Sequence, residues 1–231
     1  MPGDDTRKRI VIAIDGPAGS GKSTLAALLA RRYGYTNIET GAMYRALTLK
    51  ALETKTALED EAALVNLLEL AHFELQPQGE GCRVLLDGRD VTDRVRRTDV
   101  TEAVPRVASH RRVRDRMVRL QREFGRQGGV VMEGRDIGTK VFPDAQIKIF
   151  LDAAPEVRGS RRFLQDAKAS MPEASVLAEL RARDEHDRTR ANSPLIPAAD
   201  AVVIDSTSLS LEQVAERAMA IIERKLAEGK S

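Results

Sequence analysis

The sequence predicts an α/β fold in which helices cover both faces of a five-stranded parallel sheet. Three observations predict it: short apolar runs recur along the 231-residue chain, longer helical patterns separate them, and neither an internal repeat nor a low-complexity segment interrupts this order. Continuous apolar runs are typical of strands that are buried on both faces. Strands that alternate with helices form parallel sheets covered by those helices, so the core is expected to have three layers.

Five short segments are the expected strands of this sheet, and four of them are apolar runs. The first, at 10–14, leads through a glycine-rich turn into a helix over 22–33 that Gly34 is expected to end. The other strands are expected at 35–39, 129–132, 146–151 and 201–204. Apolar residues at helical spacing predict further helices at 41–53, 59–71, 110–126, 156–168, 173–190 and 210–228.

The pattern differs between residues 72 and 95, where apolar and polar residues alternate. Gly79, Gly81 and the pair Asp87-Gly88 divide this stretch. An Asp-Gly pair between two alternating runs is a strong signal for a hairpin. The stretch therefore predicts a small antiparallel sheet inserted between helices of the core.

The composition narrows the class of ligand. Of the 37 basic residues 28 are Arg, and the net charge is only +2. A nearly balanced chain is not built to neutralise the phosphates of a long nucleic acid, and with 3% aromatics and no Trp it lacks stacking platforms for single strands. Arginine suits bidentate capture of phosphate or carboxylate. We therefore expect a small anionic ligand, with neither nucleic acid nor membrane as partner.

The lack of a signal-peptide pattern at the N-terminus and the single cysteine lead us to expect a cytoplasmic protein. The N-terminal MPGDDTRKR lacks the apolar core of a signal peptide, and no apolar run approaches the ~18–20 residues of a membrane span. Cys82 is the single cysteine, so no internal disulfide and no Cys-based metal cluster are expected. The residues His72, His110 and His186 lie far apart, without the spacing of metal ligands.

The segment GPAGSGKS at 16–23 matches the phosphate-binding pattern G-x-x-x-x-G-K-[ST], between an expected strand and an expected helix. Its backbone amides are expected to surround nucleotide phosphates at a helix N-terminus. Lys22 would reach the β- and γ-phosphates, Ser23 would hold Mg²⁺ directly or through its water, and Thr24 would contact an α-phosphate oxygen. The expected ATP-binding residues here are Gly16, Pro17, Ala18, Gly19, Ser20, Gly21, Lys22, Ser23 and Thr24.

The residues after this loop favour a small-molecule kinase. The chain lacks the Asn-Lys-x-Asp of guanine-specific GTPases, and the later strands carry no acidic cluster of the motor ATPase type. The surplus of arginine instead indicates transfer of one phosphoryl group to a small anionic acceptor.

Three segments could bind this acceptor: TGAMYR at 40–45, EGRDIG at 133–138 and RARDEHDRTR at 181–190. The first two follow expected strands, at the sheet edge where ligands bind in parallel α/β folds. In the third, Arg183, Asp187 and Arg190 share one face of a helix. Each also has a structural explanation, respectively a helix cap, a turn with a surface ion pair and a solvated helix face. Spacing alone does not decide between these alternatives.

The chain resembles bacterial-type cytidylate kinases over nearly its whole length. The resemblance rests on IDGPAGSGKST, TGAMYRALTLKAL, LLDGRDVT, RVRDRMVRLQREF, EGRDIGTKVFPDAQIKIFLDA, RARDEHDRTRANSPL and AVVIDSTSLSLEQV. It implies in-line phosphoryl transfer from ATP, with Mg²⁺, to CMP or dCMP, and a monomer. It also implies one domain over 1–231, with a core (about 1–71, 127–154 and 170–231), a nucleoside-monophosphate-binding insert (about 72–109) and a short Arg-rich lid (about 155–169).

The resemblance also implies roles for single residues. Those expected to bind CMP are Thr40, Tyr44, Arg45, Arg114, Arg135, Asp136, Arg183, Asp187 and Arg190. The expected catalytic residues are Lys22, Arg135, Arg162 and Arg183, and Arg158 and Arg161 are expected to bind ATP from the lid. Asp136 would accept from cytosine N4 while Arg114 donates to N3 and O2. Uracil has a carbonyl at position 4, which a carboxylate would repel.

One position departs from the family pattern. Pro105 stands where some members place a Ser that contacts the base. Either that contact is lost, with looser cytosine preference, or a neighbour such as Ser109 replaces it. Two other functions stay open at this point: a P-loop kinase for another anion such as UMP or shikimate, or a regulatory nucleic-acid-binding ATPase that uses the Arg-rich helix 111–126.

Overall fold

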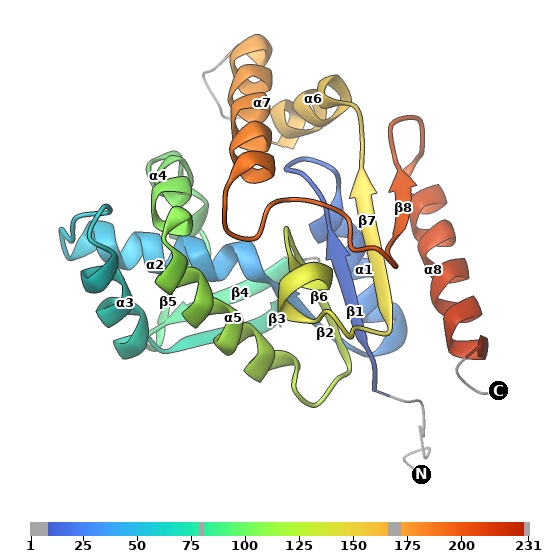
Figure 1. Cartoon of the computed structure of the whole chain (residues 1–231). Helices are drawn as coiled ribbons and strands as arrows, with labels where there is room; N and C mark the ends of the chain where they lie inside the picture. The colour runs from blue at the N-terminus through green and yellow to red at the C-terminus, as the bar shows by residue number, and fades with distance from the viewer. Residues whose placement is uncertain (1–8, 79–80, 166–171, 229–231) are drawn as a thin grey trace.

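A five-stranded parallel sheet forms the centre of the protein (Figure 1). The computed structural model describes residues 9–78, 81–165 and 172–228. The strands are β1 (Val11–Asp15), β2 (Thr36–Glu39), β6 (Val130–Gly134), β7 (Ile147–Asp152) and β8 (Val202–Asp205). Their order is β2-β6-β1-β7-β8, and every adjacent pair is parallel. All five predicted strands are confirmed, each within two residues of its predicted bounds.

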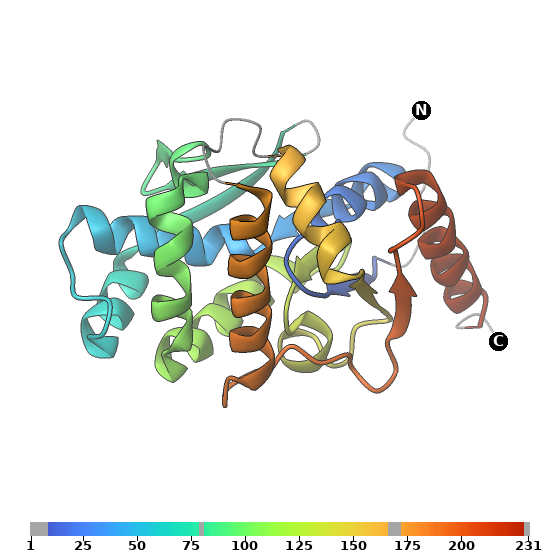
Figure 2. The same cartoon turned by 90° about the horizontal axis from the view of Figure 1, so that it is seen from above.

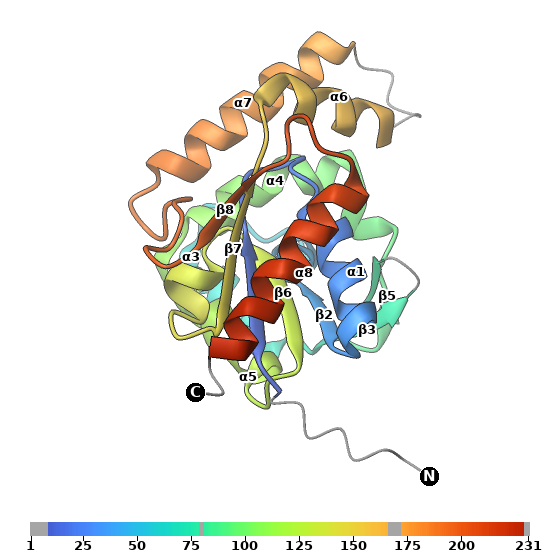
Figure 3. The ribbon, with the colours of Figure 1, turned by 90° about the vertical axis from the view of Figure 1, so that its right-hand side faces the viewer.

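Helices cover both faces of this sheet and make the three layers that the sequence predicts. Helices α1 (Lys22–Tyr33) and α8 (Leu211–Glu228) lie on one face (Figure 3). Helix α5 (Arg111–Gly125) and the short π-helix η2 (Ile137–Val141) lie on the other. The alternation of strand side chains explains this: Ile12 and Ile14 of β1 pack toward α1 and α8, whereas Val11 and Ala13 pack toward α5 and η2.

The predicted small antiparallel sheet is also present. It consists of β3 (Phe73–Gln78), β4 (Gly81–Leu86) and β5 (Arg89–Asp90), in that order. Asp87 and Gly88 join β4 to β5 with φ angles of 52° and 77°. Positive φ at both positions is what a tight hairpin turn requires, which is why Asp-Gly predicted it. A 3₁₀ turn, η1 (Arg94–Arg96), follows the sheet.

Helix α4 (Thr98–Ser109) is an element to which the sequence analysis assigned no structure. Its apolar residues Val100, Val104 and Val107 are buried at helical spacing, but Pro105 stands inside the helix. Proline lacks the backbone N–H that would bond to the carbonyl of Thr101, and such a residue normally argues against a helix interior. The free energy gained by burying these valines outweighs the missing hydrogen bond here.

Helices α2 (Thr40–Glu53) and α3 (Glu61–Leu70) share one apolar cluster with the small sheet, α4 and the first half of α5. Met43, Leu64, Val84, Val107 and Met117 are among its buried members. The predicted division into core, insert and lid stays a prediction. The packing nevertheless groups α2 and α3 with the insert rather than with the central sheet.

Helices α6 (Pro155–Gln165) and α7 (Glu173–Thr189) pack against each other above the carboxyl ends of the central strands (Figures 1 and 2). They correspond to the predicted helices at 156–168 and 173–190, and residues 166–168 lie outside the described part of the chain. The predicted lid therefore coincides with α6 where it is described. Within the described residues, no helix combines the length and the apolar character needed to cross a membrane.

Candidate active site

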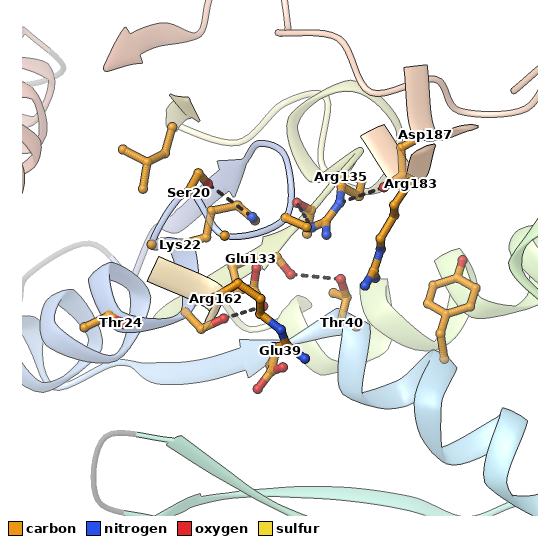
Figure 4. Close-up of a pocket in the computed structure, with 18 of the residues that line it drawn as sticks. Ser20, Lys22, Thr24, Glu39, Thr40, Glu133, Arg135, Arg162, Arg183 and Asp187 are labelled. Atoms are coloured by element: carbon orange, nitrogen blue, oxygen red, sulfur yellow. Dashed lines mark hydrogen bonds and ion pairs between the residues drawn. The ribbon is translucent and has the colours of Figure 1, made fainter. Parts of the chain in front are cut away.

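A cavity of about 950 Å³ lies at the carboxyl ends of the central strands, beneath α6 and α7 (Figure 4). The residues that line it come from the loop after β1, from α2 and α4, from the end of β6 and from both upper helices. Among the described lining residues nine are Lys or Arg and four are Asp or Glu. The basic ones are Lys22, Arg45, Arg96, Arg114, Arg135, Arg161, Arg162, Arg183 and Arg190. This excess of positive charge fits a strongly anionic ligand.

The phosphate loop (residues 16–24) forms one wall, and its backbone has a shape that only glycine permits at two points. Gly16 has φ +151°, and a Cβ there would lie 2.0 Å from the carbonyl oxygen of Leu151. Gly19 has φ +75°, and a Cβ there would lie 2.9 Å from the carbonyl oxygen of Arg158. The loop ends at Gly21, where no side chain caps α1. The first amides of α1 are thus left for an anion, as the sequence predicts.

Lys22 is buried beside this loop, and its Nζ donates to the Pro17 carbonyl at 2.6 Å and to Ser20 Oγ at 3.3 Å. Burial, together with the positive charge of Arg135, lowers the pKa of Lys22 to about 7, although Glu133 acts in the opposite direction. A buried ammonium with so few partners gains most from a neighbouring polyanion. Lys22 is therefore placed to neutralise phosphate charge.

Glu133 is a site residue that the sequence analysis missed. It lies buried near the end of β6, and Ser23 Oγ donates to its Oε1 at 3.2 Å. Burial raises the pKa of Glu133, whereas Lys22 lowers it. Glu39 pairs with Glu133 in the register of β2 and β6, so two buried carboxylates stand side by side at this edge of the sheet. A glutamate near the end of each of two apolar strands was the signal available in the sequence.

Carboxylates also position several arginines of the cavity. Arg45 forms an ion pair with Glu39. Asp187 accepts from Arg135 Nε at 3.0 Å and from Arg190 Nη1 at 3.2 Å. Burial alone would raise the pKa of Asp187, but these two guanidinium groups hold it below its ordinary value.

Several arginines of the cavity have buried N–H groups without a protein acceptor among the described residues. Burial and the nearby Arg135 lower the pKa of Arg183 to about 10, which shows how closely the positive charges approach one another. The Nε of Arg45, the Nε of Arg114 and the Nη2 of Arg190 are buried without a protein partner. Because buried donors are nearly always satisfied in native proteins, these groups point to a site that a ligand completes.

The far end of the cavity contains a buried ion pair. Arg114 of α5 donates from Nη2 to Asp136 Oδ2 at 2.6 Å, and its guanidinium lies 5.6 Å from the centre of the Tyr44 ring. Thr101 and Pro105 of α4 also line the cavity. Ser109 is exposed, bonds to the Arg106 carbonyl and does not line the cavity, so it is not the replacement hydroxyl that the sequence analysis considered. Thr101 is the hydroxyl residue on the cavity face of this helix.

Residues 12–224 match the protein family described as cytidylate kinase. This chain belongs to the cytidylate kinase family. It is 47% identical over 222 residues to the cytidylate kinase of Geobacillus sp. (strain WCH70), covering 95% of this chain and 99% of that one. It is 49% identical over 220 residues to the cytidylate kinase of Bacillus pumilus, covering 94% and 98% respectively. A solved structure of an uncharacterized protein from Eubacterium ventriosum shares the fold, with a TM-score of 0.50 and 15% identity over 94% of this chain and 98% of that chain.

Most residues expected from the cytidylate kinase pattern line this one cavity; Gly16, Pro17 and Arg158 do not. The sequence analysis in turn missed four aliphatic residues that line the cavity, which are Leu164, Leu209, Leu211 and Val214. Single aliphatic residues give no signal of their own, so only the folded arrangement places them in the lining. The individual binding roles stay predictions.

Arg158 has other partners than the ATP phosphates expected for it. It is 2% exposed, and its Nη1 pairs with Asp184 Oδ2 at 2.6 Å and donates to the Ala18 carbonyl at 3.0 Å. Its Nε donates to the Ala153 carbonyl at 2.8 Å. In this structure Arg158 therefore fastens α6 and α7 to the outside of the phosphate loop instead of facing the cavity.

Replacing Asp184 with alanine is expected to lower the free energy of unfolding by about 3–5 kcal/mol, because it leaves the buried Arg158 guanidinium without its counter-ion. Urea denaturation of the purified protein measures this change. The exposed pair of Glu156 and Arg181 joins the same two helices, so Glu156→Ala is the matched control and is expected to change stability little. Equal midpoints for both variants would contradict a structural role of the buried pair.

Proposed function

We propose that this protein phosphorylates CMP and dCMP, with ATP as the donor, to give CDP and dCDP. The observation that carries the proposal is the buried pair of Arg114 and Asp136 at the far end of a basic cavity that begins at a phosphate loop. A carboxylate that accepts from N4 and a guanidinium that donates to N3 and O2 match cytosine. Uracil would place a carbonyl oxygen against Asp136. Membership of the cytidylate kinase family supports the same substrate class.

The charges in the cavity support a transfer that depends on positioning. The acceptor phosphate is already an anion, so no general base is required. Lys22 and Arg162 would neutralise charge from the donor side, and Arg135 and Arg183 from the acceptor side. In-line attack by an acceptor oxygen on the γ-phosphorus needs both nucleotides held end to end, and the arginines that line the cavity would hold their phosphates.

We further propose that Mg²⁺ accompanies ATP next to Ser23. The Ser23 hydroxyl and the Glu133 carboxylate lie 3.2 Å apart at the phosphate loop. Both are oxygen groups of the kind that Mg²⁺ binds directly or through its waters, so these residues fit the ion. When bound, Mg²⁺ neutralises charge that develops on the β- and γ-phosphate oxygens.

A coupled assay of ADP release with Mg-ATP tests the proposal on a panel of CMP, dCMP, UMP, AMP, GMP, dTMP and shikimate. Turnover confined to CMP and dCMP is the expected result. Comparable turnover with UMP would keep the kinase but overturn the reading of cytosine by Asp136, and would direct attention to Pro105. Turnover with none of these acceptors would overturn the proposal. RNA binding that weakens steeply with salt would then favour the regulatory ATPase.

A further inference from the structure

The segment that leaves β6 is held in place from both neighbouring strands. β6 lies between β1 and β2 in the sheet, and the residues that follow it include Arg135 and Asp136. From the β2 side, Thr40 Oγ1 donates to the Glu133 carbonyl at 2.8 Å. A Cβ on Gly134 would lie 2.6 Å from that hydroxyl oxygen, so the two segments touch. The turn after β6 is thus fixed on one flank by α2.

From the β1 side, the contact is the carboxylate of Asp15, the last residue of that strand. Asp15 is 4% exposed. Its Oδ1 accepts from the Ile137 amide and its Oδ2 from the Gly138 amide, both at 2.7 Å. Gly138 is pressed against this carboxylate, since a Cβ there would lie 3.3 Å from Asp15 Oδ2. Asp15 itself does not line the cavity.

We propose that Asp15 is a positioning residue, which fixes the turn that presents Arg135 and Asp136 to the acceptor nucleotide. The proposal rests on the function proposed above and adds a residue to it. Asp136 has φ −146° and ψ 27°, directly before the π-helical turn of η2. Its carbonyl accepts from the Lys140 and Val141 amides of that turn, whereas the Ile137 and Gly138 amides at the start of the turn donate to Asp15.

The geometry requires the ionised carboxylate. Only that form offers two acceptor oxygens to two amide donors, whereas a protonated acid or an amide places a donor against one of them. Charged groups near Asp15 are Asp136 in the turn itself, Lys22 of α1 and Lys148 of β7, whose stem approaches Gly138. Burial raises the pKa of Asp15 to about 7, although both amides lower it. Acceptor binding should therefore weaken as the pH falls below about 7.

Asp15→Asn tests the proposal with steady-state kinetics and a separate titration of a fluorescent ATP analogue. The loss of one buried hydrogen bond to a charged group is expected to raise the KM for CMP roughly 10-fold, with ATP affinity nearly unchanged. The part of the wild-type rise of this KM below about pH 7 that Asp15 causes should be absent in the variant, so the rise should be smaller there; what remains belongs to groups that both proteins share, such as Lys22. The matched control is Asp205→Asn: Asp205 also ends a strand and accepts from a backbone amide, that of Thr207 at 2.8 Å, but is exposed. Its KM for CMP should not change.

A wild-type KM for CMP in Asp15→Asn would overturn the proposal. Equal losses of ATP affinity and CMP affinity would do the same, because Asp15 would then shape the phosphate loop. Amide exchange in the wild-type protein supplies a test that needs neither a folded variant nor the proposed reaction. After correction for intrinsic exchange rates, the protection factors of the Ile137 and Gly138 amides should decrease as the pH is lowered from 8 to 6. Constant protection would contradict the role of Asp15, whereas failure of the proposed function would show in the acceptor panel alone.

Discussion

Replacing Lys22 with alanine is expected to lower kcat for CMP by about 10²- to 10³-fold, the usual effect of removing one preorganised charged donor from a transition state. The Lys22 ammonium lies against the phosphate loop backbone, with Nζ 2.6 Å from the Pro17 carbonyl. Its pKa of about 7 reflects the cost of keeping it buried beside Arg135. A bound triphosphate adds negative charge to that of Glu133 and so stabilises the ammonium further. The alanine variant loses the interaction between the ammonium and the transferred phosphoryl group, at the stage of the reaction when that group carries most charge.

The Lys22→Ala variant should keep its fold, because the hydrogen bonds of the ammonium to described residues go to its own loop, at Pro17 and Ser20. Thermal melting and far-UV circular dichroism check this, so that lost activity is not confused with unfolding. Lys140→Ala is the control, since Lys140 is exposed on η2. Turnover of Lys22→Ala close to that of the control would contradict the assignment of the phosphate loop as the donor site.

The central sheet could be predicted because four of its five strands are mainly apolar runs next to a helix signal, and the fifth, β2, directly follows a predicted helix. Helix α4 could not be predicted, because Pro105 disfavours a helix locally. Only the folded structure shows that Val100, Val104 and Val107 are buried, and this burial offsets the cost of the proline. Tertiary contacts overrode a local rule here. The Asp-Gly turn gives the opposite case, because its conformation depends on two adjacent residues alone.

The candidate site divides in a similar way. Motif residues such as Lys22 and Asp136 could be predicted, and the structure brings them to one cavity. Asp15 could not, because its importance comes from β1 and β6, which become neighbours only in the folded sheet. Glu133 had only a weak signal, a glutamate near the end of an expected strand, and its contact with Ser23 forms only in the fold. Arg158 shows the converse: a motif position predicted to meet a nucleotide bonds instead to Asp184 and to the phosphate loop. Sequence identifies residue types at a site, and the fold decides which of them face the ligand.

The carboxylates between the arginines also have a physical explanation. Nine basic side chains around one cavity repel one another, and a low pKa for Arg183 is one sign of it. Asp187 bridges Arg135 and Arg190, and Glu39 pairs with Arg45. Each acid holds a guanidinium in place and still leaves N–H groups for phosphate. The site is thus ordered before a nucleotide arrives, which limits the reorganisation needed for transfer.

Replacing Asp136 with asparagine is expected to lower kcat/KM for CMP roughly 10- to 100-fold, from the ~1.5–3 kcal/mol of a hydrogen bond to a charged group. The loss with UMP should be smaller, because the wild-type carboxylate already repels the carbonyl at position 4. An amide can turn its N–H₂ group toward that carbonyl. The ratio of the two kcat/KM values should therefore shift toward UMP.

This ratio is the decisive measurement because Asp136 also neutralises the buried Arg114, at 2.6 Å. Removing the charge destabilises the site for every acceptor, so a fall in CMP activity alone would be ambiguous. If the substitution only reduces the fraction of correctly folded enzyme, both kcat/KM values fall by the same factor and their ratio does not change. Asp99→Asn supplies the control, since Asp99 pairs with Arg94 in an exposed bidentate contact outside the cavity. If Asp136→Asn loses activity equally with CMP and UMP, Asp136 only supports Arg114 and cytosine is recognised elsewhere.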